Sequence, residues 1–228
     1  MKRNAPNATR SQTLVTPHQR VHEFLRRTGK HPKKRLGQHF LIDPNVLPAI
    51  VEAAELNDAD FVLEIGAGLG CLTAAMAADA KRVVAVEVDA DLCAELHCEF
   101  TEHPRVSLVQ GDILKLDFSA LLGDFPRQNT KIIANLPYYI TTPILWRLLE
   151  YYKRIGACIL MMQMDVARRI IAPPGGKDYG ALSIGISYYA ESQIIRTLSP
   201  NQFYPSPRIN SSLVRLKIRE RPKVDVEN

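Results

Sequence analysis

The segment EIGAGLG, residues 64–70, constrains the fold of this chain more than any other feature. The apolar, β-rich run DFVLEIGAGLG stops at three glycines, Gly66, Gly68 and Gly70, and the good helix formers of CLTAAMAADA follow directly. Glycine lets the backbone turn tightly between a strand and a helix, and it allows close approach of a ligand to the backbone. A strand, a glycine turn and a helix in this order are typical of α/β proteins.

The rest of the chain repeats this alternation of strands and helices. Further strands are predicted in RVVAVEVD, RVSLVQGD, TKIIANLPYY and GACILMMQM, and helices in ADLCAELHCEF and TPILWRLLEYYKRI. Two more helices are predicted in DPNVLPAIVEAAEL and DVARRIIA, with Asp43 and Asp165 as their N-caps. The stretch ALSIGISYYA has an ambiguous period and is interpreted as a helix, whereas SQIIRTLS and SSLVRLKI are predicted strands.

This pattern predicts a doubly wound α/β fold, a mostly parallel sheet with helices on both faces. No helix separates the last two predicted strands, so we expect them to be antiparallel. The sheet belongs to one domain, residues 33–219. Residues 1–32 are predicted to form a basic, flexible arm and residues 220–228 a short tail.

The positive charge of the chain is concentrated in its amino-terminal head. Residues 1–35 hold ten Lys and Arg residues and a single acid, Glu23, a net charge of +9, whereas the remaining residues carry −4. A flexible basic arm adds sequence-independent attraction to nucleic-acid phosphates. A solubilising tail and an Arg-rich organellar presequence are the alternatives, although Pro6 and Pro17 interrupt any long amphipathic helix there.

Apolar segments and cysteines indicate the compartment. No segment approaches the roughly 20 apolar residues of a membrane span, and the amino terminus lacks a secretory apolar core. We therefore expect a soluble, cytoplasmic protein without a membrane partner. Cys71, Cys93, Cys98 and Cys158 form no CxxC pair, which predicts reduced thiols. His97 beside Cys98 has no second pair at metal-ligand spacing, so no metal site is expected.

Polar residues stand at the ends of successive predicted strands. Glu87 follows Gly66 by 21 residues, where a carboxylate can accept two hydrogen bonds from a ribose diol. Asp112 ends the third strand, placed to accept from the exocyclic amine of a base, and Asn135 ends the fourth. Strand ends of an open α/β sheet converge on one crevice, so these residues predict a site for a nucleoside cofactor. Cys71 replaces the third glycine of the usual dinucleotide fingerprint, which argues against a pyrophosphate on the helix.

The loop NLPYYITTP, residues 135–143, places an amide, two prolines and two adjacent tyrosines directly after a predicted buried strand. Proline cannot continue a sheet ladder and Asn favours turns, so the chain leaves the sheet at Asn135 with its polar and aromatic groups in a loop. Such a loop is a candidate place for chemistry. Glu64, at the end of the first strand, is open to two interpretations: it satisfies nearby amides, or it contacts a ligand.

Together these segments resemble the class I S-adenosylmethionine-dependent methyltransferases, in particular the ribosomal RNA adenine N6-dimethyltransferases of the bacterial small-subunit type. The resemblance covers residues 33–218 and is carried in order by LGQHFLID, EIGAGLGCLT, VEVDADL, QGDIL, NLPYYITTPIL, KDYGALSI and FYPSPRINSSLVRL. It implies a Rossmann-like fold with a seven-stranded, mostly parallel sheet whose last strand is antiparallel. It also implies N6,N6-dimethylation of adenosines in 16S ribosomal RNA during ribosome biogenesis, by a monomer whose partner is ribosomal RNA or the small-subunit precursor.

The resemblance further implies which residues hold the cofactor. The S-adenosylmethionine pocket would be lined by His39, Leu41, Gly66, Glu87, Asp112 and Asn135. Glu87 would contact the ribose and Asp112 the adenine amine. His39 stands where the family usually has Asn.

Catalytic roles are implied in the same way. The side-chain oxygen of Asn135 and the backbone carbonyl of Leu136 would accept the protons of the target amine. Pro137 would fix the turn, Tyr138 would stack on the target base, and Phe203 would form the opposing wall of the adenine slot. Tyr139 is expected in the core. Four cations are candidates for phosphate contacts or, alternatively, solvated charges: Arg168, Arg169, Lys177 and Arg208.

Two alternative functions stay open. One is a large-subunit RNA adenine N6-methyltransferase of the antibiotic-resistance type, although NLPYYITTP and KDYGALSI look nearer to the small-subunit group. The other is a nucleic-acid-binding relative without catalysis, against which the intact EIGAGLG and NLPY segments argue. Family members usually continue into a small helical carboxy-terminal domain that we expect to be missing here, either because the sequence is a piece of a longer chain or because it is a naturally short form.

Overall fold

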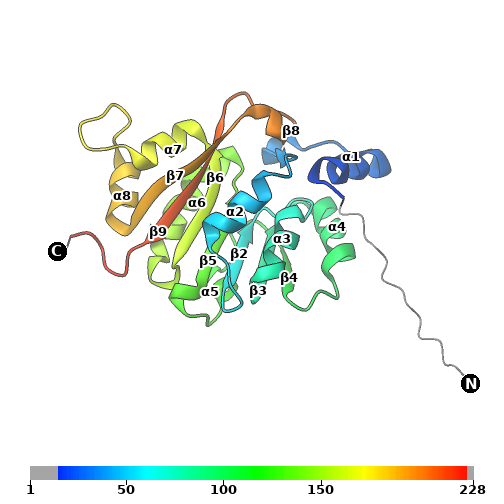
Figure 1. Cartoon of the computed structure of the whole chain (residues 1–228), viewed down its shortest axis with the longest axis horizontal. Coiled ribbons are helices and arrows are strands. Elements are labelled where there is room, and N and C mark those ends of the chain that lie inside the picture. Colours follow the sequence, from blue (N-terminus) through cyan, green and yellow to red (C-terminus); the bar gives the residue numbers. More distant parts are fainter. Residues whose placement is uncertain (1–14, 225–228) are drawn as a thin grey trace, which may run out of the picture.

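A computed structural model of the chain describes residues 15–224, and within them seven strands form one sheet (Figure 1). The strand order is β4-β3-β2-β5-β6-β9-β7, and the short strands β1 and β8 form a separate antiparallel pair. The strands are β1 (Phe40–Leu41), β2 (Phe61–Ile65), β3 (Arg82–Glu87), β4 (Val106–Gln110), β5 (Thr130–Asn135), β6 (Ala157–Gln163), β7 (Ala190–Leu198), β8 (Phe203–Tyr204) and β9 (Ser211–Ile218).

Strand directions confirm the predicted fold class. β2 runs parallel to β3 and β5, β3 to β4, and β5 to β6, whereas β9 is antiparallel to both of its neighbours, β6 and β7. The carboxyl ends of the five parallel strands therefore share one edge of the sheet. This edge is where open α/β sheets bind ligands.

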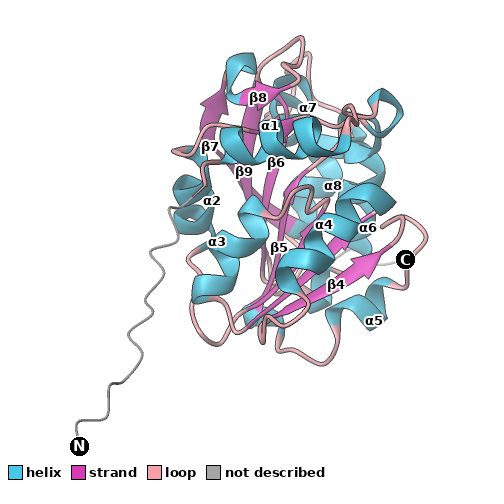
Figure 2. Ribbon diagram, turned by 90° about the vertical axis from the view of Figure 1, so that its right-hand side faces the viewer, coloured by secondary structure: helices cyan, strands magenta, loops and turns pink. Residues whose placement is uncertain are grey.

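Helices cover both faces of the sheet (Figure 2). They are α1 (Pro17–Thr28), α2 (Val46–Ala54), α3 (Cys71–Asp79), α4 (Ala90–Phe100), α5 (Phe118–Leu122), α6 (Thr141–Glu150), α7 (Met164–Ile171) and α8 (Ala181–Tyr189). Apolar side chains of α2, α3 and α4 form one buried cluster with the sheet, and those of α5 to α8 form another. Within residues 15–224 no helix is both long and apolar enough to cross a lipid bilayer.

Alternation along the central strands builds both clusters at once. In β2, Val62 joins the cluster of α2 to α4 and Leu63 joins that of α5 to α8, because successive side chains point to opposite faces. Both side chains are completely buried, and each such burial contributes roughly 1.5–3 kcal/mol. The continuous apolar runs in the sequence are thus explained by a sheet that is covered on both faces.

Two predicted helix caps differ from the structure. The cap of α2 is Asn45 rather than Asp43, whose carboxylate instead accepts from the Asn45 amide at 2.9 Å and from Gln202 Nε2 at 2.6 Å. Helix α7 begins at Met164, so Asp165 lies in its first turn and is not its cap. The ambiguous stretch interpreted as a helix is confirmed as α8.

The predicted flexible arm is wrong for the part that the structure describes, because residues 17–28 form helix α1. Thr16 caps it: the Gln19 amide donates to Thr16 Oγ1 at 3.2 Å, and the Thr16 amide donates to Gln19 Oε1 at 2.9 Å. Pro17 occupies the first turn, where its missing N–H would have no partner within the helix, so it starts the helix instead of interrupting it. Residues 1–14 of the predicted arm and 225–228 of the tail lie outside the described residues.

Helix α1 packs onto the rest of the molecule. Val21 and Phe24 are buried in a third apolar cluster with Leu69 and Leu92. Because α1 contributes to this buried cluster, the predicted domain boundary at residue 33 falls inside the folded unit.

Cations on and just after α1 pair with acids of α4 and its cap. This α1–α4 seam consists of the pairs Arg20–Glu99, Arg27–Glu95, Lys30–Asp91, Lys33–Asp89 and Lys33–Asp91. The side chain of Arg20 also donates to the Leu69 carbonyl at 3.0 Å. Much of the positive charge between residues 15 and 33 is therefore neutralised within the molecule.

Candidate active site

A cavity of about 320 Å³ opens at the carboxyl ends of the central parallel strands. This volume lies at the lower end of the range for small-molecule sites. Its lining includes every residue expected for the cofactor pocket and four of the five expected for catalysis, with Asn135 in both sets: His39, Leu41, Gly66, Glu87, Asp112, Asn135, Leu136, Pro137 and Tyr138. The predicted convergence of the strand ends on one crevice is confirmed.

The glycine turn brings backbone into the cavity wall. Gly66, Gly68 and Gly70 have φ angles of 77°, 61° and 78°, which residues other than glycine rarely adopt. The Gly66 amide donates to the carbonyl of Val86 at 2.8 Å, so the turn is tied to the neighbouring strand. A side chain at Gly70 would also place its Cβ 2.7 Å from the ring of Phe100.

Glu87 presents a fixed carboxylate to the cavity. The residue is 6% exposed, and its Oε1 accepts from the amides of Val88 at 2.8 Å and Asp89 at 2.9 Å, while Oε2 accepts from Gly68 at 2.9 Å. Burial raises the pKa of this carboxyl, although the three backbone hydrogen bonds oppose the shift. Because Oε2 accepts only one of the three backbone hydrogen bonds, it can still accept a hydrogen bond from a hydroxyl group of a ligand.

Glu64 is a second acid in the cavity wall and is 1% exposed. Among described residues, its carboxylate accepts a hydrogen bond only from the Thr73 hydroxyl, at 2.5 Å, and not from backbone amides. Burial raises its pKa to about 8, and the nearby charge of Glu87 adds to the shift. In the absence of a ligand Glu64 is therefore neutral below pH 8, and a positively charged ligand bound beside it would favour its ionised form.

Asp112 and Tyr139 stand at the mouth of the cavity. Asp112 is partly exposed; its Oδ1 accepts from the Leu114 amide at 3.0 Å, and its Oδ2 lies 3.8 Å from Lys115 Nζ. Tyr139, which we expected in the core, is 55% exposed, and its ring lies against Gly37. Partial burial raises the pKa of the Tyr139 phenol, and the charge of Asp112 acts in the same direction.

Asn135 closes β5 with its carboxamide in the cavity. Its Nδ2 donates to the backbone carbonyl of His39 at 2.9 Å, and among described residues none donates to its Oδ1. The next amide, of Leu136, donates to the Met161 carbonyl at 2.9 Å, while the Leu136 side chain is buried. Leu136 therefore reaches the cavity through its backbone, and Pro137 ends the strand.

Tyr138 places an aromatic ring beside this amide. Its hydroxyl lies 2.9 Å from Ser211 Oγ, and its ring stacks on the His39 imidazole with centroids 5.3 Å apart and planes inclined at 27°. Burial raises the pKa of the Tyr138 phenol. The ring is thus held at its tip and on one face.

Phe203 is the predicted site residue that the structure does not bring to the cavity. It is 2% exposed and packs in the cluster of α2 to α4, whereas the cavity lining excludes it. Phe203 pairs with Leu41 in the β1–β8 ladder, and the alternation of that short strand turns Tyr204, not Phe203, toward helix α1, 5.4 Å from the His22 ring.

Sequence reasoning also missed wall residues that come from distant elements. Val21 of α1, Phe40 of β1 and Leu69 of the glycine turn line the cavity. Phe40 belongs to the segment LGQHFLID, which the family resemblance had singled out, so the sequence did hold a signal for it. Its ring lies 3.7 Å from the position that a Cβ on Gly68 would take. Val21 had no signal in the sequence because its place depends on how α1 packs.

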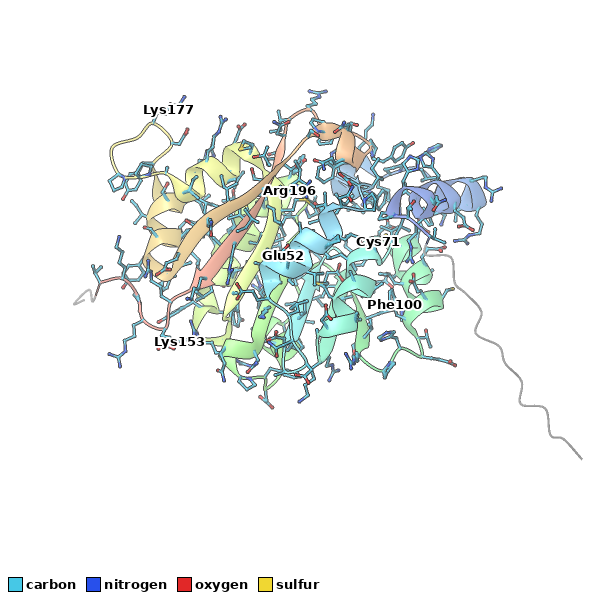
Figure 3. All side chains as sticks on the ribbon, viewed as in Figure 1. Glu52, Cys71, Phe100, Lys153, Lys177 and Arg196 are labelled. Atoms are coloured by element: carbon cyan, nitrogen blue, oxygen red, sulfur yellow. The ribbon has the colours of Figure 1, made fainter. Side chains whose placement is uncertain are left out.

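The four cations named as candidates for RNA contact are exposed near the edge that carries the cavity. Arg168 and Arg169 lie on α7, which follows the carboxyl end of β6, and Arg208 lies just before β9, whose Ser211 pairs with Gln163 at that end. Lys177 projects from the loop after α7 (Figure 3). Among described residues none of the four is in an ion pair. Within residues 15–224 no three His, Cys, Asp or Glu side chains are grouped as metal ligands.

Comparison with known proteins decides the family. The family model described as "Ribosomal RNA adenine dimethylase" matches residues 29–228. The chain belongs to the ribosomal RNA adenine dimethylase family. The predicted resemblance is thereby confirmed.

Curated members of the ribosomal RNA adenine dimethylase family are close in sequence. The chain is 44% identical over 222 residues to Ribosomal RNA small subunit methyltransferase A of Moorella thermoacetica, in an alignment that covers 95% of this chain and 77% of that protein. It is 43% identical over 218 residues to the protein of the same name from Shouchella clausii, in an alignment that covers 95% of this chain and 73% of that protein.

Solved structures share the fold of this family member. A dimethyladenosine transferase from Plasmodium falciparum aligns with a TM-score of 0.70 and 28% identity, over 78% of this chain and 62% of that chain. The 23S rRNA methyltransferase ErmE aligns with a TM-score of 0.72 and 27% identity, over 82% of this chain and 72% of that chain. An RNA methyltransferase from Salinibacter ruber, solved in complex with S-adenosyl-L-homocysteine, shares the fold with a TM-score of 0.51 and 16% identity. That alignment covers 82% of this chain and 98% of that chain.

Proposed function

We propose that this chain transfers methyl groups from S-adenosylmethionine to the N6 atoms of adenosines in small-subunit ribosomal RNA, forming N6,N6-dimethyladenosine. The observation that carries the proposal is the Asn135 carboxamide, whose Nδ2 is held by the His39 carbonyl so that Oδ1 is left as an acceptor in the cavity. The small subunit is favoured over the large one because the chain is 44% identical to a small-subunit enzyme and 27% identical to a 23S rRNA methyltransferase.

The side chains of the cavity fit a cationic nucleoside ligand. Glu64 is a buried acid without a cationic partner, and Glu87 is a carboxylate fixed by three backbone amides. S-adenosylmethionine supplies an electrophilic methyl group on a positively charged sulfur. In this proposal Glu87 accepts from the ribose hydroxyls, Asp112 accepts from the adenine amine, and the backbone of Gly66 allows close approach. His39 and Leu41 complete the cofactor pocket.

Asn135 and Leu136 act on the target amine. The lone pair of an adenine N6 amine is delocalised into the ring, so the amine needs acceptors for its protons and alignment with the methyl group. We assign the acceptor roles to Asn135 Oδ1 and to the Leu136 carbonyl. Such alignment can supply ~7–11 kcal/mol of the barrier, and it requires no strong base.

Tyr138 supplies the stacking surface for the target base. Its ring is held by Ser211 and His39 before any ligand arrives. Base stacking on an aromatic side chain is worth ~1–3 kcal/mol, which helps offset the few kcal/mol needed to extrude a base. Phe203 is left out of this proposal because it is buried away from the cavity.

The partner and setting complete the proposal. We infer that the RNA is met within the small-subunit precursor, in the cytoplasm, and that the chain acts as a monomer. Three exposed cations near the sheet edge that carries the cavity support contact with a large polyanion: Arg168, Arg169 and Arg208.

The experiment is transfer of labelled methyl from S-adenosylmethionine to unmethylated small ribosomal subunits, followed by nucleoside analysis. Wild-type chain should form N6,N6-dimethyladenosine, Asn135→Ala should abolish it, and Gln193→Ala, which removes an exposed amide on β7, should behave as wild type. Unmethylated large subunits serve as the competing substrate. Methylation of large subunits alone would establish the large-subunit alternative, and cofactor binding without transfer to either would favour a binding module.

A further inference from the structure

We propose that His39 is a positioning residue of methyl transfer, which holds the Asn135 carboxamide and the Tyr138 ring in their working orientations. The inference rests on the proposed function and extends it, because the family resemblance gives residue 39 only a place in the cofactor pocket.

The backbone of His39 fixes which end of the Asn135 amide faces the ligand. A carboxamide has a donor end and an acceptor end, and the donor Nδ2 is bonded to the His39 carbonyl at 2.9 Å. The acceptor Oδ1 is therefore the end left for the substrate. This choice holds only while the carbonyl of residue 39 stays in place.

The imidazole of His39 pins that backbone. Its Nδ1 lies 2.6 Å from the carbonyl oxygen of Pro205, and because a carbonyl only accepts, Nδ1 must carry a proton and donate. The bond ties the segment before β1 to the loop after β8. The β1–β8 ladder contains two residue pairs, and Gln202 bonds to Ile42 and Asp43 beyond one end of it. The bond from His39 to Pro205 closes the other end of the ladder, the end that carries His39 at the cavity.

The same ring orients Tyr138. The two rings stack with centroids 5.3 Å apart, and the Tyr138 hydroxyl lies 2.9 Å from Ser211 Oγ. Contact at one face and at the tip removes the rotational freedom of the phenol. One residue thus orders both groups, the acceptor of Asn135 through its backbone carbonyl and the stacking ring of Tyr138 through its imidazole.

Single-turnover kinetics with saturating cofactor and RNA test this role. His39→Ala removes the bond to Pro205 and the stack together, and it should lower the transfer rate roughly 10–100-fold, as small misplacements of reacting groups do. The dissociation constant for S-adenosylmethionine should rise by a smaller factor than the rate falls, because His39 is one of several residues of the cofactor pocket and Glu64 and Glu87 are untouched. His31→Ala, an exposed histidine in the approach segment, is the matched control.

Two further variants separate the contacts of the ring. His39→Asn keeps a donor close to the position of Nδ1 and loses the stack, whereas His39→Phe keeps a stacking ring and loses the donor. Each should recover part of the rate that His39→Ala loses. Melting temperatures of all variants show whether they are folded.

Several outcomes would overturn the inference. An active wild type with an equally active His39→Ala variant refutes it and leaves the proposed function standing. Loss of cofactor affinity in proportion to loss of rate assigns His39 to the cofactor pocket alone. A wild-type chain that binds the cofactor and transfers no methyl refutes the proposed function and this inference with it.

Discussion

Glu64 links the stability of the molecule to pH. Its carboxyl is buried, and burial raises its pKa from 4.5 to about 8. Between these values the carboxyl is neutral in the folded chain and ionised in the unfolded chain, so folding takes up a proton. The contribution of Glu64 to stability is therefore full below pH 4.5, falls as the pH rises, and is lost above pH 8.

Replacing Glu64 by Gln should remove this dependence. Between pH 5 and pH 8 the free energy of unfolding of the wild type should fall, relative to Glu64→Gln, by up to about 4 kcal/mol, because each pH unit corresponds to about 1.4 kcal/mol for one proton. Urea unfolding at several pH values measures this difference in the free energy of unfolding, with Asp58→Asn, a change at an exposed acid, as the control. Parallel stability curves for wild type and Glu64→Gln would show that Glu64 is ionised in the fold.

Individual site residues were predictable where they close a parallel strand. Glu87 and Asn135 end apolar runs, and strand ends must converge whatever the loops do. Phe203 and Tyr139 were placed wrongly, because each lies in an element of only two or three residues, where a shift by one residue exchanges the buried and exposed sides. The contacts of His39 had no sequence signal, because Pro205 is 166 residues away.

Among the elements, α1 differs most from expectation. A head rich in Lys and Arg that contains prolines has the composition of a disordered arm. Residues 17–28 of this head form a helix because Val21 and Phe24 pack in an apolar cluster and because α4 carries acids at positions that match the cations of α1. Those acids follow their partners by 56 to 79 residues, so local sequence could not reveal them.

The α1–α4 seam should support cofactor binding. Val21 lines the cavity, and Arg20 donates to the Leu69 carbonyl in the glycine turn, so loosening α1 loosens one wall. Reversing two acids, Glu95→Arg with Glu99→Arg, should raise the dissociation constant for S-adenosylmethionine severalfold and increase proteolysis within α1. High salt should weaken binding to the wild type in the same direction, because salt screens exposed ion pairs.

A charge swap provides the control for the seam. Adding Arg20→Glu and Arg27→Glu to the reversed acids rebuilds both pairs with opposite polarity and should recover part of the affinity. The recovery should be incomplete because Arg20→Glu also removes the bond from Arg20 to Leu69. Glu102→Arg, an exposed acid just after α4, should have no effect. Unchanged cofactor binding in the reversed variant would mean that α1 packs by its apolar face alone.

At the scale of the whole molecule, the two edges of the sheet differ in function. The edge at the carboxyl ends of the parallel strands carries the cavity, and Arg168, Arg169 and Lys177 are exposed near it. Lys153 lies toward the opposite edge, in the turn before β6 begins (Figure 3). Both edges thus expose cations, and only one edge adjoins the site. A substrate as large as ribosomal RNA must meet the cavity edge for a base to reach Asn135.

Charge reversal at the two edges should therefore have unequal effects. Arg168→Glu with Arg169→Glu should raise KM for the RNA substrate about tenfold or more, leave cofactor affinity unchanged, and reduce the slope of log affinity against log salt by roughly 1.4–1.8, the loss expected for two phosphate contacts. Lys153→Glu, with the same kind of change at the far edge, should alter none of these quantities. Equal effects from both edges would indicate that the RNA responds to total charge and not to a defined surface. An effect from Lys153→Glu alone would place the RNA on the wrong side of the sheet for transfer at Asn135, and would overturn the assignment of the cavity as the methylation site.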